Sequence, residues 1–207
     1  MEAKFIVIEG LEGAGKSTVI SSISDYLRAR SFQCIVTREP GGTPMAEAIR
    51  DCVKQDWQET VTEQTELLLM YAARSQLVSN VILPSLQNNV WVIGDRHDLS
   101  TVAYQGGGRG IAVAQLDMLK QLTLGDFAPD YTLYLDIDPA KGLERARGRG
   151  QLDRIEQAGL AFFERARDMY LSKISGMENA CCIDASASKE VVEQHAVQAL
   201  SAWMDTI

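Results

Sequence analysis

The segment Gly10–Ser17 is the part of the chain best suited to chemistry, because it reads G-x-x-x-x-G-K-S. Glycines let the backbone turn its N–H groups toward phosphate oxygens, and a helix starting near Lys16 would add its positive end. Lys16 can reach the β and γ oxygens of a nucleoside triphosphate, and the Ser17 hydroxyl can bind Mg²⁺. The alternative is a plain glycine-rich turn. We expect ATP to bind along Gly10, Leu11, Glu12, Gly13, Ala14, Gly15, Lys16, Ser17 and Thr18.

Two arginines, Arg38 and Arg96, each follow a short apolar run that is typical of a buried strand. A guanidinium forms two parallel hydrogen bonds with a phosphate, so two of them at one sheet edge indicate a second anion site. Asp95 precedes Arg96 and is placed to hold Mg²⁺ through water. A surface ion pair is the alternative for each arginine. A second anion site favours a kinase with a small acceptor over an ATPase that couples hydrolysis to motion.

Met70 and Arg74 lie four residues apart and therefore share one face of a predicted helix. An apolar side chain beside a hydrogen-bond donor suits a nucleobase, since one can pack on the ring while the other binds its polar edge. The alternative is that Met70 fills the hydrophobic core, as methionine often does.

Four arginines fall within ten residues, with two glycines among them: Arg145, Arg147, Arg149 and Arg154. Spaced arginines usually mark a solvated face. This segment follows a predicted strand, however, so it should lie over the nucleotide edge of the sheet, where arginines can neutralise a transferring phosphoryl group. We expect an arginine-rich lid over about residues 141–156 that excludes water during transfer.

Short apolar runs alternate with longer helical patterns, which favours an α/β fold with a parallel sheet between helices. Strands are predicted at 5–8, 33–37, 90–93, 131–135 and 180–183, and helices at 16–30, 44–53, 62–83, 111–124, 138–147, 160–174 and 189–204. Thr43-Pro44 and Asp138-Pro139 each place a capping side chain before a proline that can begin a helix. No repeat or low-complexity tract divides the chain, so we expect residues 1–207 to form a single domain. Ligands of such sheets bind at the carboxyl ends of the strands.

The 207 residues have a net charge of −8 and a calculated pI of about 4.8, which argues against a broad nucleic-acid or membrane surface. No apolar run approaches the about 20 residues that span a bilayer. Four cysteines without a C-x-x-C pair, and two histidines, do not favour a zinc site or a disulfide framework. Cys181 and Cys182 are expected to fill the core. We expect a cytoplasmic protein that binds neither nucleic acid nor membranes.

Five segments together resemble the bacterial thymidylate kinases. These are the phosphate loop, TREPGGT, YAARSQ, GDRHDLSTVAYQGGGRG and RARGRGQLDRIEQ, which occur in the family's order over essentially the whole chain. The resemblance implies a three-layer P-loop NTPase fold with a five-stranded parallel sheet, and a homodimer. It also implies transfer of the γ-phosphate of ATP to dTMP, giving dTDP and ADP, with Mg²⁺.

The resemblance also implies roles for individual residues. Arg96 would grip the dTMP phosphate, with Arg38 close to it, and Lys16, Arg96, Arg149 and Glu12 would be the catalytic residues. Arg149 is our first choice for the catalytic lid arginine, before Arg145 and Arg154. Glu12 would point across the cleft toward the sugar 3′-hydroxyl. The dTMP site would comprise Arg38, Glu39, Met70, Arg74, Arg96, Ser100, Thr101, Tyr104 and Gln105, and Ser17 and Asp95 would hold the metal.

Within that site, the resemblance places Arg74 on a thymine carbonyl and Tyr104 beside the deoxyribose, where it would disfavour a 2′-hydroxyl. Met70 occupies the position where the family usually has a phenylalanine that stacks on thymine. Two alternatives stay open at this point: another nucleoside monophosphate or deoxynucleoside kinase, and a regulatory ATPase. A GTPase would normally carry an N-K-x-D motif, which this chain lacks.

Overall fold

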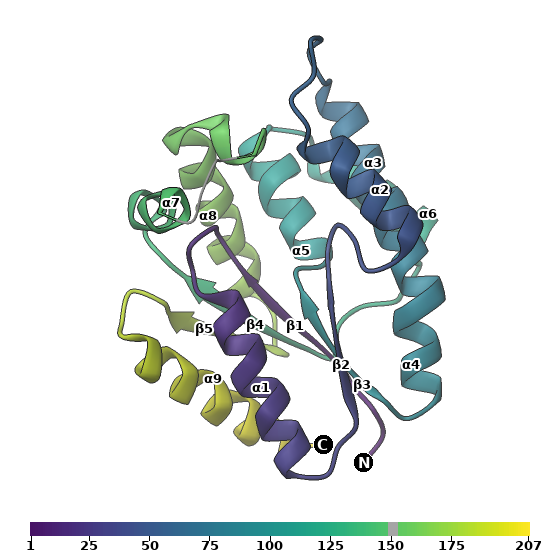
Figure 1. The fold of residues 1–207 in the computed structure, drawn as a ribbon, viewed down its shortest axis with the longest axis vertical. Coiled ribbons are helices and arrows are strands. Elements are labelled where there is room, and N and C mark those ends of the chain that lie inside the picture. The colour runs from purple at the N-terminus through teal and green to yellow at the C-terminus, as the bar shows by residue number, and fades with distance from the viewer. Residues whose placement is uncertain (149–152) are drawn as a thin grey trace.

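The computed structural model describes residues 1–148 and 153–207, which form a sheet between two layers of helices (Figure 1). The strands are parallel and lie in the order β2-β3-β1-β4-β5. Their bounds are β1 (Phe5–Gly10), β2 (Cys34–Arg38), β3 (Trp91–Asp95), β4 (Tyr131–Asp136) and β5 (Ala180–Asp184). The predicted α/β fold with a five-stranded parallel sheet is confirmed.

The central strand β1 shows how the two layers are built, because successive side chains point to opposite faces. Ile6 and Ile8 belong to the core that holds the buried residues of α1 (Lys16–Ala29) and α9 (Lys189–Met204). Phe5 and Val7 belong to a separate cluster with residues from the helices of the other face. Glu9 follows the same alternation as Phe5 and Val7, so its carboxylate is directed away from α1.

Two of the remaining helices begin at the capping residues that the sequence predicts. The Thr43 hydroxyl accepts a hydrogen bond from Ala46 N at 3.2 Å at the start of α2 (Pro44–Lys54). Asp138 Oδ1 accepts from Lys141 N at 3.1 Å at the start of α7 (Pro139–Arg147). The other long helices are α6 (Val113–Leu124) and α8 (Leu160–Ile174), and η3 (Glu156–Ala158) is a short 3₁₀ turn.

The predicted helix at 62–83 is longer and less regular than expected. It comprises α3 (Glu63–Leu77), the π-helical turn η1 (Val78–Ile82) and α4 (Leu83–Gln87). Pro84 lacks a backbone N–H and cannot continue the regular ladder, so the irregular turn precedes it and the helix resumes afterwards.

A helical segment after β3 was not predicted. It comprises the short helix α5 (Asp98–Thr101) and the π-helical η2 (Val102–Gly108), which packs against α8. Three consecutive glycines at its end resemble a loop by propensity. The packing explains them: a Cβ on Gly107 would lie 2.7 Å from Arg165 O, and one on Gly108 would meet the Phe162 ring.

The cysteine pair corrects one expectation. β5 is an edge strand, so Cys181 is only partly buried and Cys182 is exposed instead of filling the core. Within residues 1–148 and 153–207, no helix combines the length and the apolar character that crossing a membrane would require.

Candidate active site

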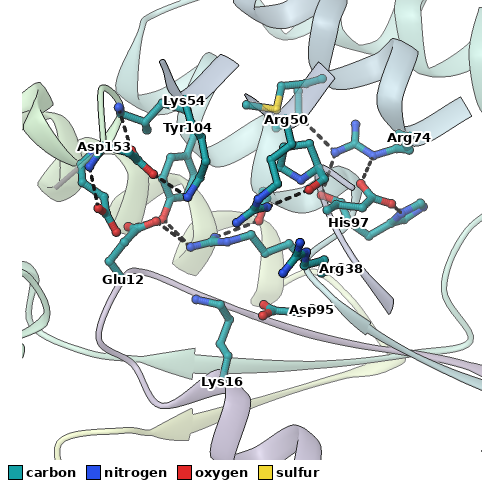
Figure 2. A pocket seen from close by; sticks show the side chains of 18 of the residues that line it. Glu12, Lys16, Arg38, Arg50, Lys54, Arg74, Asp95, His97, Tyr104 and Asp153 are labelled. Atoms are coloured by element: carbon teal, nitrogen blue, oxygen red, sulfur yellow. Dashed lines mark hydrogen bonds and ion pairs between the residues drawn. The ribbon is translucent and has the colours of Figure 1, made fainter. Parts of the chain in front are cut away.

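A single pocket at the carboxyl edge of the sheet contains most of the predicted site residues. Its walls come from the phosphate loop, β2, β3, α2, α3, η2 and the segment that precedes α8. Figure 2 shows side chains from these elements converging on one space. The predicted residues that line it are Glu12, Gly13, Gly15, Lys16, Ser17, Arg38, Glu39, Met70, Arg74, Asp95, Arg96, Ser100, Thr101, Tyr104 and Gln105.

The phosphate loop has the backbone that its glycines predict. Gly10, Gly13 and Gly15 have φ values of 145°, 75° and 90°, which side chains rarely allow. A Cβ on Gly13 would collide with the carbonyl of Gly142, so α7 packs directly on the loop. The side chains of Leu11 and Ala14 are buried in the core, which leaves only their backbone for a ligand.

Lys16 lies at the start of α1 and folds back over the loop. Its Nζ donates to the carbonyls of Gly10 and Leu11, both at 3.1 Å. Burial, together with the positive charge of Arg96, lowers the pKa of Lys16 to about 8. The Asp95 carboxylate, at the end of β3, lies near enough for its charge to oppose this lowering of the Lys16 pKa. Bringing a polyphosphate beside Lys16 would stabilise its charged form.

Asp95 and Ser17 are placed as ligands for a cation. Strand register sets Asp95 opposite Ile8 on one side and Arg38 on the other. Its Oδ1 atom is buried and has no hydrogen-bond partner among the residues that the structure describes. No cluster of three or more His, Cys, Asp or Glu residues suited to a metal occurs within that part of the chain. This donor set fits Mg²⁺, which usually takes one or two protein oxygens and completes its shell with phosphates and water.

Arg96 connects the phosphate loop to the rest of the pocket. Its Nη2 donates to Glu12 Oε1 at 2.7 Å and to the Tyr104 hydroxyl at 3.1 Å, and its Nη1 donates to Ser100 Oγ at 3.1 Å. Its backbone φ of 72° lies in the left-handed region, where residues other than glycine are strained. Burial opposes its charge, but Tyr104 and Glu12 raise the pKa of Arg96 well above its ordinary value.

The loop carboxylate turns away from the loop's own backbone amides. Glu12 Oε1 accepts from Arg96, and Oε2 accepts from the Tyr104 hydroxyl at 2.6 Å. Both partners lie beyond the sheet edge, on β3's end and on η2. The geometry therefore directs the Glu12 carboxylate toward Arg96 and Tyr104 (Figure 2).

Arg74 lies at the far end of the pocket and is almost entirely enclosed, with 3% of its side chain exposed. Its Nε donates to Glu39 Oε2 at 2.6 Å, and its Nη2 donates to His97 O at 3.0 Å and Thr101 Oγ1 at 2.9 Å. Its Nη1 is buried and makes no hydrogen bond with the described residues, but it lies 3.5 Å from Asp98 Oδ1 as an ion pair. Met70 lies one turn earlier on the same wall. One donor and one apolar side chain thus face the same end of the pocket.

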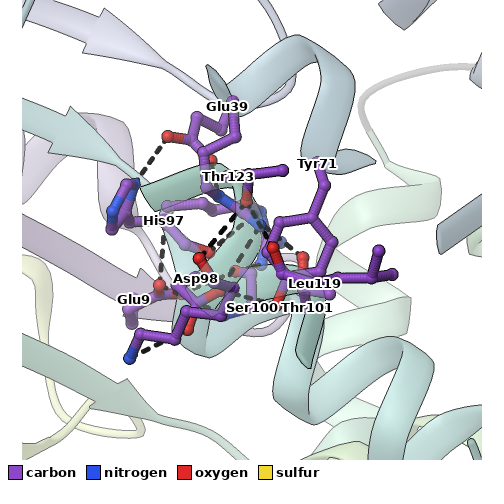
Figure 3. Close-up of polar contacts among 12 residues, drawn as sticks. Glu9, Glu39, Tyr71, His97, Asp98, Ser100, Thr101, Leu119 and Thr123 are labelled. Carbon is purple, nitrogen blue, oxygen red and sulfur yellow. Dashed lines mark hydrogen bonds and ion pairs between the residues drawn. The ribbon is translucent and has the colours of Figure 1, made fainter. Parts of the chain in front are cut away.

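A supporting network below the pocket was missed from the sequence (Figure 3). Glu9 is fully buried, and its Oε1 accepts from His97 N and Ser100 N at 2.9 and 3.2 Å. Its Oε2 accepts from Ser100 Oγ at 2.6 Å and from the Tyr170 hydroxyl at 2.9 Å. Burial raises the pKa of Glu9. Glu9 precedes the phosphate loop by one residue. In the sequence it is only one polar residue at the end of an apolar strand, and this pattern does not indicate that it supports the site.

Glu39 lines the pocket but also has partners inside the protein. Both of its oxygens are used inside the protein, one by Arg74 and the other by His97 Nδ1 at 2.7 Å. Burial would raise the pKa of Glu39, but Arg74 outweighs burial and lowers it. Glu39 therefore fixes Arg74, and its carboxylate has little capacity left for a ligand.

Other pocket residues were also missed. Arg50 and Lys54 reach the pocket from α2, and Asp153, Ile155 and Glu156 reach it from the segment before α8. Lys54 Nζ lies 2.7 Å from Asp153 Oδ2, so this ion pair joins the two elements. Charged residues on one face of an amphipathic helix such as α2 usually face solvent. The sequence therefore did not indicate that Arg50 and Lys54 line the pocket.

The predicted lid is only partly described. Arg149, our first choice for the catalytic lid arginine, lies outside the described residues. Arg145 donates to Ala185 O at 3.2 Å and lies close to the loop at Gly13 O. Arg154 forms an ion pair with Glu66 at 2.8 Å and does not line the pocket.

Arg38 lines the pocket from β2, but its guanidinium forms an ion pair with a residue of α2. Its Nη2 donates to Glu47 Oε2 at 2.8 Å, and this exposed pair leaves the guanidinium at the rim. An incoming phosphate would compete with Glu47 for Arg38.

Comparison with known proteins identifies the family. A sequence model described as thymidylate kinase matches residues 8–196. The chain belongs to the thymidylate kinase family. It is 58% identical to a thymidylate kinase of Alteromonas mediterranea over 99% of this chain and 92% of that protein. Thymidylate kinases of Idiomarina loihiensis and Vibrio campbellii are 54% and 55% identical, each over 99% of this chain and 100% and 98% of their own lengths.

The prediction of a thymidylate kinase is therefore confirmed, and with it a phosphotransferase activity. The regulatory ATPase and the other nucleotide kinases considered from the sequence are not supported. Membership in this family gives the pocket its nucleotide substrates, and the geometry described above suggests which residues serve each of them.

Proposed function

We propose that this thymidylate kinase transfers the γ-phosphoryl group of ATP in line to the phosphate of dTMP, through the residues of the pocket. The observation that supports this most strongly is the Arg96–Glu12 contact, which places a phosphate-binding side chain against the ATP loop. An oxygen of dTMP would attack the γ-phosphorus as the bond to the β–γ bridging oxygen breaks, so dTDP forms and ADP leaves. Because a phosphate monoester is largely dianionic at pH 7, no side chain has to remove a proton.

At the phosphate end, charge stabilisation is the main task, since phosphoryl transfer needs little covalent chemistry from the protein. The loop amides and Lys16 would hold the β and γ phosphates. Arg96 would bind the dTMP phosphate from the opposite side, with Arg38 at the rim. The lid would supply a further cation, and we assign this role to Arg149.

We propose that Ser17 and Asp95 hold Mg²⁺. The buried, unpartnered Oδ1 of Asp95 and the exposed Ser17 hydroxyl at the start of α1 support this assignment. When bound there, the ion would neutralise charge on the β and γ phosphates. Glu12 would accept a hydrogen bond from the sugar hydroxyl of dTMP, since it already accepts one from Tyr104 at that side of the pocket.

We propose that thymine lies between Met70 and Arg74. Arg74 Nη1 makes no hydrogen bond and lies 3.5 Å from Asp98 Oδ1, and we propose that it donates to a carbonyl of the base while Met70 packs on the ring. Ser100, Thr101 and Tyr104 would line the space between base and phosphate, with Gln105 beside the base.

We further propose that the enzyme is a homodimer and works in the cytoplasm. Met118 and Leu122 of α6 are 71% and 80% exposed, and Leu68 of the adjoining α3 is also exposed. Large apolar side chains grouped on neighbouring helices suit a subunit interface.

An acceptor panel tests the proposed reaction. Initial rates with ATP and Mg²⁺ would be measured for dTMP, dUMP, UMP, dCMP and thymidine, together with ATP hydrolysis in the absence of an acceptor. We expect dTMP to be preferred and hydrolysis without acceptor to be slow. Equal ATP turnover with and without dTMP would contradict the proposal.

A further inference from the structure

Glu66 is a buried acid that the proposed chemistry does not use. It lies in the first turn of α3 with 1% of its side chain exposed. Its Oε1 accepts from Gln105 Nε2 at 2.9 Å and from Arg109 Nε at 3.2 Å. Its Oε2 accepts from Arg109 Nη2 at 3.0 Å and lies 2.8 Å from Arg154 Nη2. One carboxylate thus joins α3 to η2 and to the segment before α8.

The environment keeps Glu66 ionised. Burial alone would raise the pKa of Glu66, but the hydrogen bonds from Arg109 and Gln105 outweigh burial and lower it. An ionised carboxylate only accepts hydrogen bonds. Gln105 must therefore turn its amide nitrogen toward Glu66, and its amide oxygen must point the other way. This orientation follows from chemistry and does not depend on telling oxygen from nitrogen.

The free amide oxygen belongs to a residue of the pocket wall. Gln105 lines the pocket beside Arg74 and Thr101, and its oxygen has no hydrogen-bond partner within the described part of the chain. Arg74 Nη1 on the same wall makes no hydrogen bond there and is held 3.5 Å from Asp98 Oδ1 as an ion pair. The base end of the pocket therefore offers one donor and one acceptor in fixed positions.

This pair of groups matches one type of base. Thymine and uracil carry an N3–H donor next to a C4 carbonyl, which would meet the Gln105 oxygen and the Arg74 donor. Cytosine carries an unprotonated N3 next to a C4 amino group. Its N3 acceptor would face the Gln105 oxygen, and its amino donor would face the Arg74 donor, so neither hydrogen bond could form. A buried polar group left without its partner is unfavourable, which makes such a mismatch selective.

We propose that Glu66 sets the base selectivity of the reaction by fixing the Gln105 amide with its oxygen toward the N3–H of the acceptor base. Glu66 touches no substrate and is a positioning residue. The inference rests on the proposed placement of the base beside Arg74.

The test compares kcat/KM for dTMP, dUMP and dCMP in the wild type and in Glu66→Gln. The new amide can present either its oxygen or its nitrogen to Gln105, so Gln105 is free to flip. We expect the dTMP-to-dCMP ratio to fall about tenfold, mainly through KM, while the dTMP-to-dUMP ratio stays unchanged because both bases share the N3–H and C4 carbonyl.

Arg109→Gln is the matched control, because it breaks the same cluster but leaves the carboxylate facing Gln105. It should lower thermal stability without changing the dTMP-to-dCMP ratio. If Glu66→Gln does not fold, the double variant Glu66→Gln/Arg109→Gln removes one of the unpaired cations and is compared with Arg109→Gln alone.

Three results would overturn the proposal. The first is a folded Glu66→Gln enzyme with the wild-type ratio, while Gln105→Met loses selectivity. The second is an equal loss of selectivity in Glu66→Gln and Arg109→Gln. The third is wild-type enzyme that binds N3-methyl-dTMP as tightly as dTMP. If Gln105→Met and Arg74→Met both keep the wild-type ratio, the placement of the base is itself wrong.

Discussion

At the scale of single residues, Arg96 has the most demanding position in the site. Its strained backbone places one guanidinium within reach of Glu12, Tyr104 and Ser100, and Glu9 supports that arrangement from below through Ser100. Such strain persists only where the surroundings determine the conformation. Arg96, which we propose binds the acceptor phosphate, is therefore held in a fixed position by the protein itself.

Replacing Arg96 with alanine should lower kcat/KM for dTMP by about 100- to 1,000-fold, since it removes a charge-assisted contact to the acceptor phosphate. Steady-state rates at varied dTMP concentration measure the effect. Arg28→Ala removes an exposed arginine of α1 and is the control. An Arg96→Ala enzyme with wild-type kcat/KM would contradict the assigned role.

Glu12→Gln should reduce dTMP turnover far more than ATP affinity. The carboxylate accepts hydrogen bonds from Arg96 and Tyr104, two residues that we propose face the acceptor. Turnover is measured by steady-state kinetics and ATP affinity by equilibrium titration of the same variant. Equal losses in both would mean that Glu12 only shapes the loop.

At the scale of elements, η2 and α8 pack closely against each other. Gly107 and Gly108 let the η2 backbone approach Arg165 and Phe162 directly. The close packing of η2 on α8 fixes the position of Tyr104 relative to α8. The Tyr104 ring also contacts Phe162 and Phe163 of α8. The position of Tyr104 in the pocket wall thus depends on two glycines that do not line the pocket.

Gly107→Ala should destabilise the protein by about 2 kcal/mol, because its methyl group would press on the Arg165 carbonyl. For a chain of this size, that corresponds to a fall in Tm of about 4–8 °C. Thermal unfolding followed by circular dichroism measures it. The control is Gly176→Ala, where a Cβ would lie no closer than 3.8 Å to Lys173 O. Matching Tm values for the two variants would count against the close-packing argument.

The sequence predicts elements where one local rule dominates. The apolar runs of the strands and the capping residues Thr43 and Asp138 belong to this class. Prediction from the sequence fails at η2, because the glycines that allow close packing against α8 are also typical of a loop. It also fails for Glu9, Arg50 and Lys54, because their partners are distant in the chain and only the folded sheet edge brings them together.

At the scale of the whole molecule, several buried acids each join elements that are distant in sequence. Glu39 joins β2's end to α3, Glu66 joins α3 to η2, and Asp98 joins α5 to α3 and α6. Cationic neighbours outweigh burial and lower the pKa of each of these acids. The fold therefore depends on their ionisation.

Glu39→Gln should lower the free energy of unfolding by about 3 kcal/mol at pH 7, because it leaves Arg74 buried without its main partner. Glu39 has a lowered pKa in the folded state, so its contribution is complete above the ordinary value of 4.5 and is lost as pH falls below that value. Urea unfolding of wild type and variant at pH 7, 5 and 4 measures the difference. We expect the difference in the free energy of unfolding between wild type and variant to be smaller at pH 4 than at pH 7. A difference that grows in acid would contradict the assignment.

Leu122→Lys should convert the proposed dimer to a monomer by placing a charge on the exposed apolar face of α6. Light scattering after size-exclusion chromatography measures the molar mass. Val191→Lys, on α9 and therefore remote from α6, is the control. A wild-type protein that is monomeric at micromolar concentration would contradict the dimer.

The pairing of Glu12 with Arg96 has a consequence for how the acceptor enters. Within a molecule of net charge −8, Arg96 already has an anionic partner that is tethered to the phosphate loop. An acceptor phosphate must displace that carboxylate and does not meet a bare cation. Binding is then an exchange of one anion for another, so the affinity for dTMP should depend less on ionic strength than the number of basic groups in the pocket would suggest. The displaced carboxylate is left beside the sugar of the ligand that displaced it.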